Sequence, residues 1–203
     1  MRKILLILLL LCAWSTTSSA QDARTLFMDA PDSVLPLLPR NVRADCIDFA
    51  DAGMDYPVSN LLGGKSTLKV LGKDYLLLQS TAVSTVEMKV LPMGESSVVC
   101  VVNTVSAESA DSRIAFYDAD WKRLDTDSFF ASPSIRDFFA DADKSVLDLC
   151  DIYLVSLKLN AADSTLVAEY TMPDYMNDDD AAKVRALLNK IVYRWNGARF
   201  VKE

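Results

Sequence analysis

Acidic side chains beside an aromatic ring are the first residues in this chain that suggest chemistry. Asp118 and Asp120 come just before Trp121, and Asp125 and Asp127 follow it closely. Paired carboxylates next to an aromatic side chain are typical of carbohydrate sites. A hairpin turn with solvated acids has the same composition and is the commoner source of such a pattern. Asp118, Asp120 and Trp121 are therefore the candidate binding residues, and no catalytic residue is assigned.

A second acidic run lies near residue 178. Asp174, Asn177, Asp178, Asp179 and Asp180 supply clustered oxygen atoms of the kind that calcium prefers. The EF-hand spacing, with its central Gly and closing Glu, is absent. A capped helix start explains the run without an ion, because Asn caps helices and acids favour the N-terminal end of a helix. We expect no metal and no cofactor, with a calcium-stabilised domain as the weaker alternative.

Two short stretches match parts of catalytic or phosphate-binding motifs, but the residues and elements that those motifs also require are absent. Residues 63–66 (GGKS) resemble the end of a P-loop, but that motif needs Gly where Ser59 stands and a helix after its last residue. Ser66 and Lys69 fit the Ser-x-x-Lys of serine β-lactamases, but the Ser-Asp-Asn and Lys-Thr-Gly partners are missing from the sequence. A strand is predicted there, so the glycines are best explained as a turn that enters a sheet.

Composition narrows the classes of function. The chain has no histidine, which excludes Ser-His-Asp and Cys-His catalysis. The first twenty residues have the features of a secretory signal peptide: basic Arg2 and Lys3, an apolar run over 4–11, and small residues before a cleavage site near Ala20. We therefore expect a periplasmic or secreted protein. No segment of the mature chain is apolar enough over ~20 residues to span a bilayer.

The mature chain is acidic. Removing Arg2 and Lys3 with the leader leaves 19 basic residues against 28 acidic ones, a net charge of −9. Such a surface repels phosphate backbones and anionic lipid, so nucleic acid is not an expected partner. Cys46, Cys100 and Cys150 remain, an odd number for an exported protein. Cys46 and Cys100 are expected to be buried, with a Cys100–Cys150 disulfide as the alternative.

The elements that must position these residues centre on 66–124. Turn residues divide this block into strands near 66–71, 74–80, 84–91, 97–106 and 112–118, with a short one near 121–125. In the third strand Glu87 and Lys89 alternate with apolar residues, which predicts one buried and one open face. Residues 98–102 are apolar on both sides, which predicts a central strand that is covered on both faces.

Helices and hairpins flank the block. The apolar spacing predicts a helix from Asn41 to Gly53, a short helix over 135–139, strands near 151–159 and 164–171, and a helix after Asn177. The chain ends in a hairpin with a two-residue turn at Asn196-Gly197. That register places Tyr193 opposite Phe200 and Arg194 opposite Arg199.

The order of elements predicts an α+β fold with a mainly antiparallel sheet. It is a meander of about five to six strands plus later hairpins, packed with several short helices. The expected organisation is a signal peptide over 1–20 and one domain over 21–203, with a weak subdivision near 128–132 as the alternative.

Four stretches resemble a known family: LFMDAPDSVLPLL (26–38), NVRADCIDFADAGM (41–54), VSNLLGGKSTLKVLGKDYLLLQ (58–79) and DSRIAFYDADWKRL (111–124). They are similar to an uncharacterised family of exported Bacteroidetes proteins catalogued only as a domain of unknown function. The resemblance covers nearly all of the mature chain. It implies an envelope location in a Gram-negative bacterium and brings no catalytic or binding residues.

Two hypotheses follow. The first is a non-enzymatic binding or structural module that takes a protein or glycan partner in the cell envelope. The alternative is an Asp-based hydrolase of envelope or dietary glycans, with Asp118, Asp120 and Trp121 as its residues. An enzyme needs a pocket with a desolvated, pKa-shifted acid. A binding module should show an exposed apolar or aromatic patch.

Overall fold

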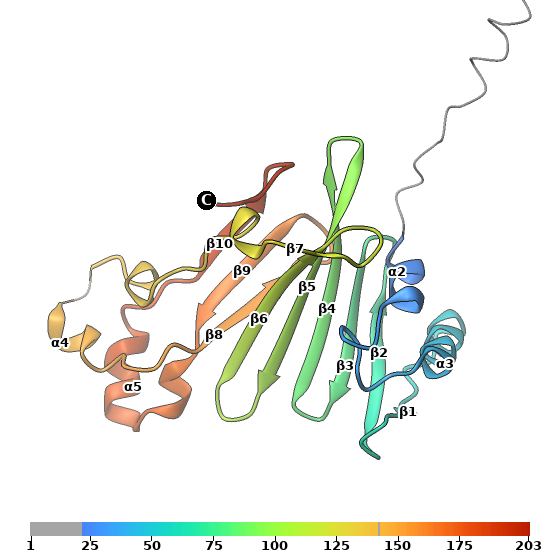
Figure 1. Cartoon of the computed structure of the whole chain (residues 1–203). Helices are drawn as coiled ribbons and strands as arrows, with labels where there is room; N and C mark the ends of the chain where they lie inside the picture. The colour runs from blue at the N-terminus through green and yellow to red at the C-terminus, as the bar shows by residue number, and fades with distance from the viewer. Residues whose placement is uncertain (1–21, 142) are drawn as a thin grey trace, which may run out of the picture.

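Two antiparallel sheets and several short helices make up the protein (Figure 1). The computed structural model describes residues 22–141 and 143–203. The leader expected at 1–20 lies outside these residues. The α+β class expected from the sequence is confirmed.

The first sheet is a seven-stranded meander in which each strand pairs with its neighbour in sequence. Every predicted boundary in the block lies within about two residues of the observed one, because turn residues end the strands where the pattern predicts. The strands are β1 (Val58–Ser59), β2 (Lys65–Leu71), β3 (Tyr75–Thr81), β4 (Ser84–Met93), β5 (Ser96–Ser106), β6 (Ala110–Tyr117) and β7 (Arg123–Leu124).

The later strands form a separate four-stranded sheet in the order β11-β10-β9-β8. Its strand β8 packs across β6, β5 and β4, so the second sheet crosses one face of the first. The strands are β8 (Val155–Leu159), β9 (Thr165–Tyr170), β10 (Ile191–Trp195) and β11 (Phe200–Lys202).

Short helices connect and cover the sheets. The α-helices are α2 (Ala23–Asp29), α3 (Arg40–Asp51), α4 (Lys144–Leu147) and α5 (Asp178–Arg185), and the 3-10 helices are η1 (Thr126–Ser128), η2 (Ile135–Phe138) and η3 (Met172–Tyr175). The Asp22 side chain caps α2 by accepting the Thr25 N–H at 2.8 Å. No helix in the described part of the chain is long and apolar enough to cross a membrane.

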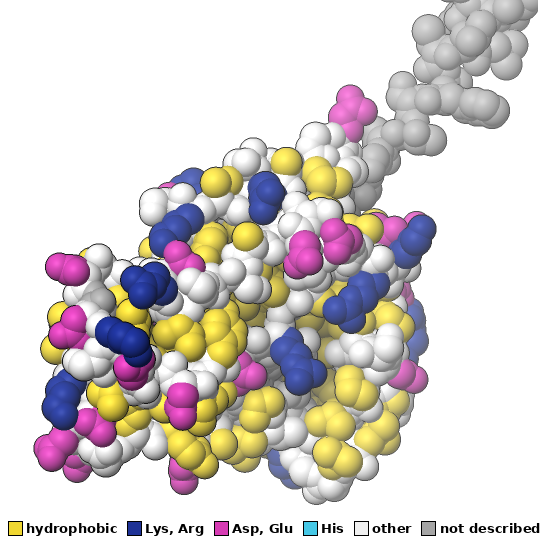
Figure 2. All heavy atoms as spheres, turned by 60° about the vertical axis from the view of Figure 1, so that its left-hand side comes forward, with side chains coloured by type: hydrophobic (Ala, Val, Ile, Leu, Met, Phe, Trp, Pro, Cys, Tyr) yellow, Lys and Arg dark blue, Asp and Glu magenta, His cyan; other side chains and the backbone are white. Residues whose placement is uncertain are grey.

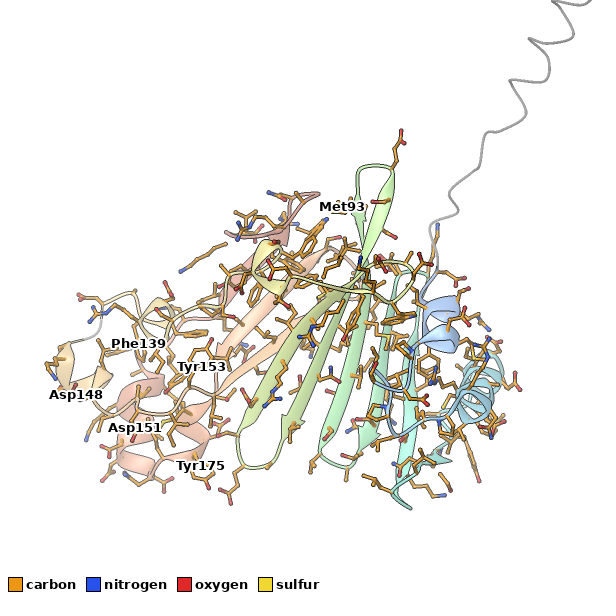
Figure 3. All side chains as sticks on the ribbon, in the orientation of Figure 1. Met93, Phe139, Asp148, Asp151, Tyr153 and Tyr175 are labelled. Carbon is orange, nitrogen blue, oxygen red and sulfur yellow. The ribbon has the colours of Figure 1, made fainter. Side chains whose placement is uncertain are left out.

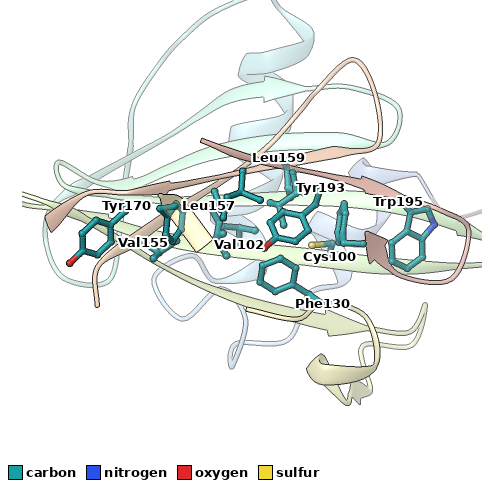
Figure 4. Packing of buried hydrophobic residues seen from close by; sticks show 14 of the residues in the cluster. Cys100, Val102, Phe130, Val155, Leu157, Leu159, Tyr170, Tyr193 and Trp195 are labelled. Atoms are coloured by element: carbon teal, nitrogen blue, oxygen red, sulfur yellow. The ribbon is translucent and has the colours of Figure 1, made fainter. Parts of the chain in front are cut away.

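The first sheet is covered on both faces, and β5 contributes to both cores. Val99 and Val101 face the core under α2 and α3. Val98, Cys100 and Val102 face the core under the second sheet, where Tyr193 and Phe130 also lie (Figure 4). All five residues of 98–102 are at most 1% exposed, which confirms the central, doubly covered strand.

The final hairpin differs in register from the prediction. Trp195 pairs with Phe200 and Arg194 with Val201, two residues away from the register that a two-residue Asn196-Gly197 turn would give. The Asn196 side chain causes the shift, because its Oδ1 accepts the N–H groups of Ala198 (2.9 Å) and Arg199 (2.8 Å). The predicted Arg194–Arg199 contact is therefore wrong, and Arg194 forms an ion pair with Glu203.

The three cysteines of the described chain are free and buried. The Cys100–Cys150 disulfide alternative is thus wrong, whereas the expected burial of Cys46 and Cys100 is confirmed. Burial raises the pKa of the Cys46 thiol to about 11. Burial also raises the pKa of the Cys100 thiol. Protonated, buried thiols are poor nucleophiles, so these residues act as small apolar side chains.

Candidate functional site

Two adjacent leucines stand in solvent at the tip of the β1–β2 hairpin. Leu61 is 67% exposed and Leu62 is 76% exposed, the highest values among the large hydrophobic side chains that the structure describes. We call residues 60–64, which join β1 to β2, the leucine turn. Leucine side chains are usually buried in a core, so the exposure of two adjacent leucines here calls for a structural explanation.

Asn60 holds the leucine turn from inside the protein. Its side chain is buried, and its Oδ1 accepts the N–H groups of Leu62 (3.1 Å) and Gly64 (3.0 Å). Its Nδ2 donates to Ser66 Oγ at 3.1 Å and to the Ser80 carbonyl at 3.2 Å. All four hydrogen-bonding positions of the amide are filled, which fixes the turn against β2 and β3.

Two further features bear on the sequence Asn-Leu-Leu-Gly-Gly. Gly63 has φ +75°, a backbone conformation that glycine adopts without strain. A Cβ at Gly64 would lie 3.4 Å from Asn60 Nδ2, which is ordinary van der Waals contact, so position 64 packs closely against the amide without requiring glycine. The Leu61 N–H also donates to the Leu37 carbonyl at 3.1 Å, which ties the turn to the segment before α3.

An open depression of about 590 Å³ adjoins the leucine turn. Its lining includes Leu62, Lys65, Thr67, Lys69, Gln79 and Thr81. Thr67 and Gln79 are cross-strand partners, so their side chains share one face of the sheet. The depression thus combines the apolar side chains of Leu62 and Ala82 with two ammonium groups and several hydrogen-bonding groups.

The polar lining continues across the first sheet as a row. The cross-strand pairs place Gln79 beside Thr85, Thr85 beside Thr104, and Thr104 beside Ser112. The far end of the row is occupied, because the Thr104 and Ser112 hydroxyls bond to each other at 2.7 Å and Ser112 Oγ accepts the Leu157 N–H at 2.9 Å. The near end, at Thr67 and Gln79, faces the depression.

A second polar cluster, which we call the inter-sheet joint, lies where β8 crosses the first sheet. Glu87 is 5% exposed, and its Oε2 accepts both the Tyr75 hydroxyl and the Leu159 N–H at 3.0 Å. Burial raises the pKa of the Glu87 carboxyl, while these two hydrogen bonds act in the opposite direction. Lys89 is 1% exposed and reaches the Ala161 carbonyl at 3.1 Å.

The joint corrects the sequence prediction that Glu87 and Lys89 lie on an open face. The apolar sequence of β5 already indicated that Glu87 and Lys89 would be buried. A central strand that is covered on both faces implies that its neighbour β4 is covered too. Among the described residues, Glu87 is a carboxyl group whose pKa is raised by burial, as the catalytic acid of an enzyme would require. Its Oε2, however, already accepts two hydrogen bonds. We therefore assign Glu87 a structural role at the joint.

The candidate residues Asp118, Asp120 and Trp121 lie in the turn between β6 and β7. Asp118 Oδ1 accepts the N–H groups of Asp120 (3.0 Å) and Lys122 (2.9 Å), and the Asp120 side chain is exposed. Trp121 has φ 62° and packs on Tyr117 with ring centroids 5.4 Å apart. Its Nε1 is buried without a hydrogen-bond partner in the described structure. The three residues are therefore neighbours, but Asp118 is used by the turn itself.

The acidic run near residue 178 forms the start of α5. Asn177 Oδ1 accepts the Asp180 N–H at 3.1 Å, and Asp180 pairs with Lys183 at 2.9 Å. Asp174 pairs with Arg185 at 2.8 Å. Within residues 22–141 and 143–203, no group of three or more Cys, Asp or Glu side chains is arranged to hold a metal ion.

Residues 60–64 were not identified from the sequence as a candidate binding surface. Two consecutive apolar residues between the turn formers Asn60 and Gly63-Gly64 were the available signal, because a turn tip normally carries polar side chains. What the sequence does not show is the burial of Asn60, which depends on Ser66 and on Ser80 of β3.

Met54, Tyr56 and Val70 are also exposed on the same side of the chain as the leucine turn, and three further exposed apolar side chains lie at the opposite end of the molecule. Ile152 is 44% exposed, Tyr153 45% and Tyr175 60%. Figure 3 places Tyr153 and Tyr175 near α5, away from α2 and α3. On this side the hydrophobic side chains are interspersed with Asp, Glu, Lys and Arg (Figure 2). Ile152 and Tyr175 therefore provide matched positions for comparison with the leucine turn.

A family model described as "Protein of unknown function (DUF3256)" matches residues 15–200. The chain belongs to this family. The match agrees with the resemblance seen in the sequence. No curated protein matches the chain.

One solved structure is similar to this DUF3256 chain over almost its full length. It is a domain of an uncharacterized protein from Porphyromonas gingivalis, a member of the Bacteroidetes, with 30% sequence identity and a TM-score of 0.79. The match covers 91% of this chain and 98% of that chain. The α+β arrangement of two antiparallel sheets is therefore shared with a Bacteroidetes protein.

Proposed function

We propose that this protein is an exported, non-enzymatic binding module of the cell envelope, and that the leucine turn is its contact surface for a protein partner. The observation that carries the proposal is the exposure of Leu61 and Leu62 on a turn that buried Asn60 holds in place. Burying one leucine side chain contributes about 1.5–3 kcal/mol. A turn that is already ordered loses little further conformational entropy on binding.

The envelope location rests on the leader sequence. Its basic start, apolar run and small residues before Ala20 are typical of exported proteins. The similarity to a Bacteroidetes protein supports a Gram-negative envelope as the setting.

A protein partner is favoured over a glycan by the chemistry of the exposed side chains. Leu61 and Leu62 are aliphatic, whereas carbohydrate sites of the kind considered for Trp121 combine an aromatic ring with paired carboxylates. At the β6–β7 turn Asp118 is bonded to backbone N–H groups and Asp120 is exposed. The hydrolase alternative has less support for this reason.

The test is quantitative capture from the envelope fraction of the source organism. Wild type, the double variant Leu61→Asn with Leu62→Asn, and the control Ile152→Asn with Tyr175→Asn are compared by mass spectrometry. We expect one protein to be captured by wild type and control and to fall at least tenfold with the leucine variant, because two buried leucines together contribute several kcal/mol.

All three proteins should melt within a few degrees of one another, since exposed substitutions usually change stability by about 0.5 kcal/mol or less. Equal capture by the leucine variant and wild type would contradict the proposal. So would equal losses in the leucine and control variants.

A further inference from the structure

We infer that the leucine turn and its adjoining depression bind an extended, acidic segment of the partner protein. This inference rests on the proposed function and deepens it. It follows from the distribution of charge along the chain, from the groups that line the depression, and from the edge of the sheet beside it.

Charge is distributed unevenly along this acidic chain. Residues 56–86 contain three lysines, Lys65, Lys69 and Lys73, and one acid, Asp74. The mature chain as a whole has a net charge of −9, so this stretch is basic on an acidic protein. A basic region on an acidic molecule attracts an acidic partner and repels basic ones, which mainly affects the rate and specificity of association.

The two lysines of the depression differ in what they contact. Lys69 Nζ lies 2.6 Å from Asp55 Oδ2, an exposed pair that contributes little to stability. Lys65 Nζ donates to the Ser59 hydroxyl at 3.0 Å and has no carboxylate partner in the described structure. The Lys65 ammonium group is therefore available to pair with a carboxylate that enters the depression.

The remaining lining fits an extended backbone. Thr67 and Thr81 contribute hydroxyl groups to one side of the sheet, and Gln79 contributes its Oε1 as an acceptor, because its Nε2 already donates to the Thr81 and Ser84 carbonyls. Strand β1 pairs only with Lys65 and Ser66, so the outer edge of β2 from Thr67 to Leu71 has no strand partner in the described chain. Every second side chain of a peptide lying there would point into the depression, which Leu62, Lys65 and Lys69 line.

A lipid surface is the competing occupant, because leucines beside lysines also suit membrane interfaces. The observations favour a protein segment. The net charge of −9 on the molecule repels an extended anionic membrane surface, whereas a short acidic segment approaches only the region around Lys65 and Lys69.

The experiment selects random 12-residue peptides on phage against the immobilised chain beginning at Asp22. Wild type, the charge-reversal variant Lys65→Glu with Lys69→Glu, and the remote control Lys122→Glu are used. We expect the wild-type and control pools to be enriched in net acidic peptides that carry a Leu, Ile or Phe. The reversed variant should select a neutral or basic pool.

One enriched peptide is then labelled and its Kd measured by fluorescence polarisation. We expect Lys65→Gln with Lys69→Gln to weaken binding by about three- to tenfold, since each exposed charge pair contributes about 0.2–1 kcal/mol. Raising NaCl from about 50 mM to about 500 mM should weaken wild-type binding by a similar factor.

Three results would overturn the inference. The first is a wild-type pool without acidic bias, and the second is a pool that charge reversal leaves unchanged. The third is binding to phosphatidylethanolamine–phosphatidylglycerol vesicles that Leu61→Asn with Leu62→Asn abolishes, which would assign the surface to lipid. If the leucine variant loses its captured protein while charge reversal does not, the proposed function stands and this inference alone fails.

Discussion

At the scale of single residues, one oxygen atom of the Glu87 side chain accepts hydrogen bonds from both sheets. Glu87 Oε2 accepts the Tyr75 hydroxyl from β3 and the Leu159 N–H from β8, so both sheets donate to the same atom. Burial raises the pKa of this carboxyl. The sequence showed Glu87 as one polar position in an alternating strand, and its burial depends on a strand that lies about seventy residues further on.

The first prediction concerns the pH dependence of stability. Because the folded pKa of Glu87 lies above its unfolded value of about 4.3, its contribution to stability is fully present below that value. It is lost as pH rises through the folded pKa. Glu87→Gln keeps a carbonyl oxygen for both donors and does not ionise. Its free energy of unfolding in urea should therefore fall less than that of wild type between about pH 4 and about pH 8.

Glu87→Ala is the control for the hydrogen bonds. It leaves the buried Tyr75 hydroxyl and Leu159 N–H without an acceptor, at about 1–3 kcal/mol each, so it should be less stable than wild type across the pH range. If Glu87→Gln and wild type lose the same stability as pH rises, the titration of Glu87 does not contribute.

At the scale of elements, the sequence predicts where the strands begin and end, but it does not predict the conformation of two turns. The strands of the first sheet are predicted well because glycine, proline and polar turn residues interrupt apolar runs at regular intervals. The final hairpin is predicted in the wrong register because Asn196 bonds through its side chain to Ala198 and Arg199. The leucine turn likewise depends on one side chain, Asn60, whose partners come from β2 and β3.

The second prediction therefore concerns Asn60. Asn60→Ala leaves the N–H groups of Leu62 and Gly64 without their acceptor, which should lower the free energy of unfolding by about 1–3 kcal/mol. It should also weaken partner capture while Leu61 and Leu62 remain, because the turn is no longer pre-ordered. Amide hydrogen exchange checks the mechanism: protection should fall at residues 61–64 more than in β5.

An exposed polar position offers a comparison for that exchange measurement. Asn189→Ala changes an amide for which no side-chain hydrogen bond is seen in the described chain, so residues 61–64 should keep their protection. Unchanged exchange at 61–64 in Asn60→Ala would show that Asn60 does not order the turn.

At the scale of the whole molecule, the two cores lie on opposite faces of the first sheet and share its strands β3, β4 and β5. The helix-side core contains Leu76, and the core under the second sheet contains Leu166, both fully buried. The sequence predicted the α+β class and a doubly covered central strand. It did not show that the later strands form their own sheet, because β8 to β11 have the same alternating pattern as an extension of the first sheet would have.

The third prediction is one cooperative unfolding transition. Since β5 belongs to both cores, Leu76→Ala and Leu166→Ala should each lower the same transition, by about 2–5 kcal/mol, the usual cost of a buried Leu→Ala change. Calorimetry and circular dichroism should report one midpoint in each variant. Two transitions, each sensitive to one variant, would instead support a division of the chain near 128–132.

The central claim is that the leucine turn is where this protein meets its partner. The most direct measurement places a photo-crosslinking amino acid at position 62 in the source organism and, in a second strain, at the exposed Tyr153. We predict one prominent crosslinked protein from position 62 and none from position 153. Equal crosslinking from both positions, or crosslinking from position 153 alone, would contradict the account.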